Sequence, residues 1–131
     1  MTPREIEEIA TKRSVRIPEA EAACEASGRD LKALLDEISL GVACRYVDGN
    51  ASFDYCDAIM NNLFNVILLG EKNVITSDLA WEIFLAFDAG EYHHQGDAPD
   101  INPEKKYTHP MLFEILRREM LDKVRNGKLT P

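Results

Sequence analysis

Apolar residues recur every three or four positions along most of the chain, and this spacing is typical of amphipathic helices. Three segments show the pattern over their whole length, namely residues 30–46, 52–69 and 77–89. No segment carries a convincing alternation of apolar and polar residues, which a half-buried strand would need. The pattern therefore predicts an all-α fold.

A fourth long helix is predicted over residues 110–126, where Pro110 follows a capping residue at Thr108 or His109. Gly127 ends this helix, because glycine readily adopts the left-handed conformation found after helix C-termini. We expect the apolar side chains of the helix to face the core: Met111, Leu112, Ile115, Leu116, Met120 or Leu121, and Val124.

Two shorter helices are predicted near the N-terminus. Residues 2–5 have the sequence of a capping box with Pro3 at the first helical position, so a helix should run to about Arg13. Pro18 then opens a second, alanine-rich helix over residues 19–26. We expect these two helices to lie together as a pair, because only a short break separates them.

These elements predict an up-and-down helical bundle of about four main helices plus a short N-terminal helical pair. The length suits a single helical domain over residues 1–131. The connections are short except for a loop at about residues 91–109, which lacks periodicity and contains two prolines and a glycine. A loop of that length is usually either functional or disordered.

The entrance to this loop concentrates side chains that can bind metals. Asp88, Glu91, His93 and His94 offer carboxylate and imidazole ligands, which Zn²⁺, Fe²⁺ and Mn²⁺ accept. Adjacent histidines point apart in any regular structure, however, so the spacing favours a solvated polar loop. We therefore expect no cofactor, with a divalent metal at these four residues as one alternative and a pH-sensitive contact surface as another.

A row of polar residues follows one face of the predicted 52–69 helix. Asp54, Asp57, Asn61 and Asn65 lie three or four positions apart, so their side chains share that face. Such rows are normally exposed to solvent, and a carboxylate in the first turn also offsets the helix dipole. The alternative is a partner-binding face, to which Tyr92 would add an aromatic side chain of the kind enriched at interfaces.

The charge is spread unevenly along the chain. Residues 1–16 carry a net charge of +1, residues 17–100 carry −12 and residues 101–131 carry +3, which together give the formal charge of −8. An anionic body disfavours nucleic acid and anionic lipid and favours a basic protein partner. The basic residues near the C-terminus are interpreted as the exposed face of the last helix: Arg117, Arg118, Lys123, Arg125 and Lys128.

The cellular context follows from what the sequence lacks. No apolar run approaches the roughly 20 residues that span a bilayer, and the first residues contain no apolar signal region. Cys24, Cys44 and Cys56 are an odd number without metal-type spacing, so we interpret them as reduced thiols acting as small buried hydrophobes. The expectation is a cytoplasmic protein without a membrane association.

Three functional hypotheses follow, and an enzyme is the less favoured class because the sequence has no phosphate loop and no nucleophile motif. The first is an acidic protein-interaction module that binds a basic partner protein, or neutralises it as toxin immunity proteins do; that comparison rests on size, helicity and charge. The second is a small metal-binding protein or enzyme that uses the loop after Gly90. The third is an oligomeric structural or regulatory subunit, such as a homodimer.

Overall fold

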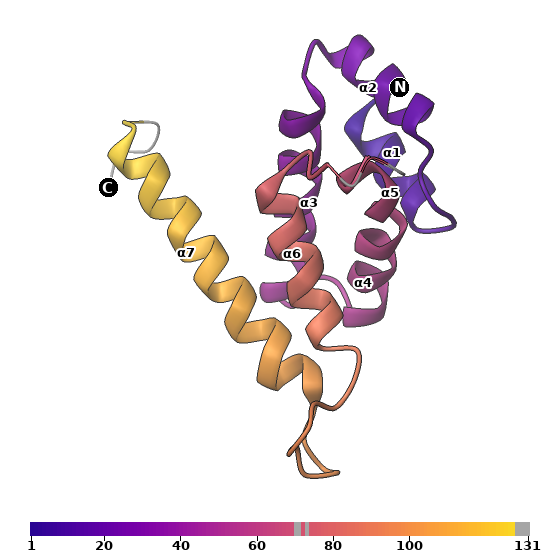
Figure 1. Cartoon of the computed structure of the whole chain (residues 1–131). Helices are drawn as coiled ribbons and strands as arrows, with labels where there is room; N and C mark the ends of the chain where they lie inside the picture. Colours follow the sequence, from indigo (N-terminus) through magenta and orange to yellow (C-terminus); the bar gives the residue numbers. More distant parts are fainter. Residues whose placement is uncertain (70–71, 73, 128–131) are drawn as a thin grey trace.

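The computed structural model describes residues 1–69, 72 and 74–127, and every regular element among them is a helix (Figure 1). In chain order they are α1 (Pro3–Ala10), α2 (Ile17–Ser27), α3 (Leu31–Val47), α4 (Phe53–Asn62), α5 (Phe64–Ile67), α6 (Asp78–Ala89), the π-helical turn η2 (Glu104–Thr108) and α7 (His109–Arg125). The predicted all-α fold is confirmed. None of the described helices is both long enough and apolar enough to cross a membrane.

Local sequence signals place most helix starts correctly. The side chains of Thr2, Asp30, Ser52 and Ser77 each accept a hydrogen bond from the backbone N–H three residues later, as N-caps do. Gly70, the predicted end of the 52–69 helix, lies outside the described residues, as does Lys128 of the basic tail.

Helix α3 forms the centre of the molecule and contacts α1, α2, α4, α6 and α7. It buries one broad face, made of two adjacent rows of residues four positions apart, which is wider than the stripe that an amphipathic surface helix buries. The buried α3 residues are Leu34, Leu35, Ile38, Ser39, Val42, Ala43 and Tyr46. The remaining helices surround α3 and close the core around it.

The predicted 52–69 helix is wrong in one respect, because it breaks at Leu63 into α4 and α5. The cause is a contact from the N-terminal segment. The backbone N–H of Val15 donates to the carbonyl of Asn62 at 2.8 Å, and the Asn62 side chain donates to the carbonyl of Ala10 at 2.7 Å. The Asn62 carbonyl therefore serves the connection between α1 and α2 rather than the next turn of its own helix.

The predicted start of the last helix is also wrong, because helical structure begins at Pro103. The side-chain oxygen of Asn102 caps it by accepting hydrogen bonds from the backbone N–H groups of the second and third residues after it. The chain then passes through η2 before α7. Pro110 explains the widened turn, since proline lacks an N–H and its ring collides with the carbonyl four residues earlier in a regular α-helix. The loop is therefore shorter than expected.

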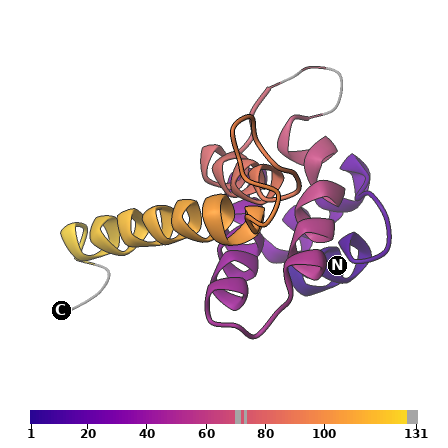
Figure 2. The same ribbon diagram turned by 90° about the horizontal axis from the view of Figure 1, so that it is seen from below.

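Helix α7 diverges from the other helices towards its C-terminal end, as both views show (Figures 1 and 2). The expectation that its apolar residues all face the core is therefore wrong. Leu112 and Ile115 are buried, but Met111, Met120 and Leu121 are 38%, 57% and 40% exposed. A helical spacing of apolar residues indicates a face that can be buried, and the body of this chain covers only the first half of it.

Candidate functional site

Asp57 lies within electrostatic range of three other carboxylates on two packed helices, and we call the four residues the acidic cluster: Asp54, Asp57, Asp88 and Glu91. The first two lie on α4, and the other two lie at the end of α6 and just beyond it. Asn61 connects the two elements, since its side-chain nitrogen donates to Glu91 Oε1 at 3.3 Å. The structure thus combines half of the predicted polar row with half of the predicted metal set.

Asp57 is the most strongly perturbed member of the acidic cluster. Its side chain is partly buried, and its Oδ1 has no hydrogen-bond partner within the described part of the chain. Burial, followed by the charge of Glu91 and a hydrogen bond to it, raises the pKa of Asp57 to about 7. The charges of Asp88 and Asp54 act in the same direction. Ionising Asp57 near neutral pH therefore costs free energy, and a cation bound nearby would offset that cost.

No member of the acidic cluster forms an ion pair with a described residue. Nine ion pairs form elsewhere among the described residues, and the carboxylates in them all lie outside the cluster. Glu7, for example, pairs with Arg45, and Asp97 pairs with Lys106. The cluster therefore presents concentrated, uncompensated negative charge.

The two remaining residues of the predicted partner-binding face, Asn65 and Tyr92, lie outside the acidic cluster. Asn65 falls on α5, beyond the break at Leu63, where its side chain is exposed. Tyr92 directly follows Glu91, is 52% exposed, and stacks on His94 with ring centroids 4.6 Å apart. Tyr92 thus provides a fixed aromatic surface beside the carboxylates.

The structure does not bring together the four residues of the predicted metal set. His93 Nε2 lies 2.9 Å from the carbonyl of Ile101 in the loop, and His94 Nε2 lies 2.8 Å from the carbonyl of Ala89 at the end of α6, so both rings contact backbone carbonyls. Asp88 and Glu91 belong to the acidic cluster instead. Within the described ranges, no three His, Cys, Asp or Glu side chains are placed to hold a metal ion.

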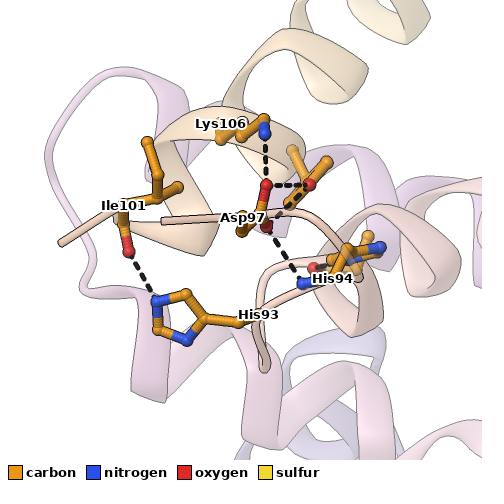
Figure 3. Close-up of polar contacts among 7 residues, drawn as sticks. His93, His94, Asp97, Ile101 and Lys106 are labelled. Carbon is orange, nitrogen blue, oxygen red and sulfur yellow. Dashed lines mark hydrogen bonds and ion pairs between the residues drawn. The ribbon is translucent and has the colours of Figure 1, made fainter. Parts of the chain in front are cut away.

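Asp97 organises the loop itself (Figure 3). Its carboxylate accepts hydrogen bonds from the ammonium of Lys106, from the backbone N–H of His94 at 3.0 Å and from the hydroxyl of Tyr107 at 2.7 and 2.8 Å. The ammonium first, and then the other two donors, hold the pKa of Asp97 well below its usual range. The contact between Asp97 and Tyr107 depends on how the loop folds back, so no local sequence pattern predicts it.

The cysteines divide into different environments. Cys56 is fully buried, and burial raises the pKa of its thiol to about 11, which agrees with the expected small hydrophobe. Cys44 is exposed on α3, so the expectation of burial is wrong for that residue. Cys24 is partly buried, and all three cysteines are free thiols.

Comparison with known proteins adds no further constraint to this geometry. The chain matches no protein-family model, no curated protein and no solved structure.

Proposed function

We propose that the protein is an acidic interaction module whose acidic cluster binds a basic partner protein. The observation that supports this proposal is the convergence of Asp54, Asp57, Asp88 and Glu91 without a neutralising cation in the described residues. Crowded like charges cost stability, and a partner that supplies lysine or arginine removes that cost on binding.

The binding contact that we propose places one cationic side chain of the partner between Asp57 and Glu91. The cation stabilises the ionised form of Asp57, so binding near neutral pH releases the proton that Asp57 retains in the free protein. Tyr92 borders this contact and offers an aromatic face to the aliphatic part of the same side chain or to a neighbouring cation. The net negative charge of the body increases the association rate at low salt.

We place this interaction in the cytoplasm, because the three cysteines are free thiols and reduced cysteines are typical of that compartment. We propose further that this binding neutralises the partner. An anionic module that covers a basic functional surface would block the access of that surface to its own anionic substrate.

Affinity purification from native lysate at low salt tests the proposal. Asp57→Asn with Glu91→Gln removes two charges from the acidic cluster, and Glu21→Gln with Glu25→Gln removes two exposed charges from α2 as the matched control. We expect a stoichiometric basic protein to be retained by the wild type and by the control, and to be lost from the cluster variant. Equal retention by both variants, or no stoichiometric basic protein on the wild type, contradicts the proposal.

A further inference from the structure

The projecting helix α7 carries a second surface that includes no member of the acidic cluster. Five residues spaced alternately three and four apart share one side of α7, as in the contact row of a helix pair: Met111, Glu114, Arg118, Leu121 and Arg125. Met111 and Leu121 are 38% and 40% exposed, and Glu114 and Arg118 are also accessible. The row therefore has apolar residues at two places, with opposite charges between them.

A shallow groove of about 440 Å³ begins at the first residue of this row. Leu85 and Glu82 of α6 form one wall, and the first turns of α7 form the other. Leu85 is 38% exposed, so this groove presents apolar surface to water in the monomer. The residues that line it are Glu82, Leu85, Pro110, Met111, Glu114 and Ile115.

The second half of α7 has little support from its own chain. Beyond Leu116, no described residue of α7 is buried, although Met120 and Leu121 are large and apolar. A short helical segment in water is only marginally stable by itself, and most helical stability comes from packing an apolar face. The projecting half therefore has the properties of a segment that packs on another surface.

We propose that the chain forms a two-fold symmetric homodimer, in which the projecting half of α7 from each copy lies antiparallel in the α6–α7 groove of the other. The choice of a second copy rests on charge complementarity within the row. The register that places Leu121 of one copy over Met111 of the other also places Glu114 opposite Arg118 of the second copy. A parallel pair would instead set each of these charges against its own kind.

The intramolecular ion pairs on this surface are compatible with the dimer. Arg118 contacts Glu82, and Arg117 contacts Glu114 at 2.7 Å, but the side chains are 40–62% exposed. Exposed pairs of this kind contribute little to stability, so rearranging or sharing them on dimerisation costs little. The apolar contact of Leu121 with Met111 and Leu85 of the other copy contributes most of the free energy of dimerisation, and the two-fold symmetry forms this contact twice.

Sedimentation equilibrium of the whole chain tests this dimer. We expect the wild type to have the mass of a dimer, and Leu121→Asp to weaken dimerisation by about 100-fold because two leucines leave the interface. Met120→Asp is the matched control, since Met120 lies on the opposite side of α7 and should remain dimeric. A wild-type monomer at about 100 μM, or a Leu121→Asp dimer as tight as the wild type, overturns the proposal.

A charge exchange tests the antiparallel register separately. Glu114→Arg and Arg118→Glu each create repulsion within their own homodimer, so each variant alone should be monomeric at the concentration where the wild type is dimeric. An equimolar mixture should form a heterodimer, because every facing pair then has opposite signs. Single variants that dimerise as tightly as the wild type, or a mixture that stays monomeric, contradict this pairing.

Discussion

Replacement of Asp57 by asparagine should change how the stability of the protein depends on pH. The substitution keeps the size of the side chain and removes its charge. The pKa of Asp57 is raised from 3.8 to about 7, so the folded state retains a proton that the unfolded chain releases near pH 4. The stability from this proton is fully present below about pH 4 and is lost as pH rises through 7.

The magnitude follows from the raised pKa and from the partial burial of the carboxyl. A rise from 3.8 to about 7 corresponds to about 4 kcal/mol if it acts in full. Since Asp57 is only partly buried, screening by water reduces the expected effect to about 1–2 kcal/mol. We therefore expect Asp57→Asn to gain about 1–2 kcal/mol relative to the wild type between pH 4 and pH 8.

Urea unfolding followed by circular dichroism at pH 4, 6 and 8 measures this difference. Glu25→Gln on α2 is the control, and its stability relative to the wild type should change little over the same range. A difference between Asp57→Asn and the wild type that is independent of pH would refute the account of the acidic cluster. So would a variant that is less stable than the wild type at pH 8.

Three further predictions concern the close packing at Gly90, the loop held by Asp97 and the exposure of the cysteines. Gly90→Ala should lower stability by about 1–3 kcal/mol in thermal unfolding, because its new carbon would lie 2.1 Å from the Thr108 hydroxyl. Gly41→Ala in α3 is the control, since it has room for the new carbon and should be neutral or stabilising. Equal melting temperatures for the two variants would argue against close packing at Gly90. Asp97→Asn should speed amide exchange across the loop on the order of tenfold, since it removes the ion pair; unchanged exchange would mean that the loop is held by other contacts. Cys44 should react with a maleimide in the folded protein, while Cys56 should react only after unfolding. Mass spectrometry of the digested protein measures the labelling, and labelling of Cys56 before Cys44 would contradict this prediction.

The sequence predicts the elements that depend on local signals. The cap residues Asp30, Ser52 and Ser77 act through bonds within four residues, so their positions follow from the sequence pattern alone. The break at Leu63 depends on a carbonyl captured by Val15, far away along the chain, and no local signal marks it. The early start of the last helix similarly depends on a widened turn that tolerates an internal proline.

The candidate site was only partly predictable for a related reason. Helical spacing correctly put Asp57 and Asn61 on one face, and composition singled out Glu91 at the exit of another helix. Their meeting depends on the packing of α4 against α6, which neither pattern contains. The sequence offers His93 and His94 as metal ligands, but in the fold their rings contact the backbone carbonyls of the loop and of the end of α6.

A lysine-rich probe tests most directly whether the acidic cluster receives basic partners. Deca-lysine is titrated into isotope-labelled protein at low salt and pH 8, and the backbone amide signals are followed by NMR. We predict that the largest shifts fall on residues 54–61 and 88–92, and that added salt or the combined Asp57→Asn and Glu91→Gln substitutions abolish them. Shifts centred on α2, or equal shifts in the wild type and the variant, would contradict the account.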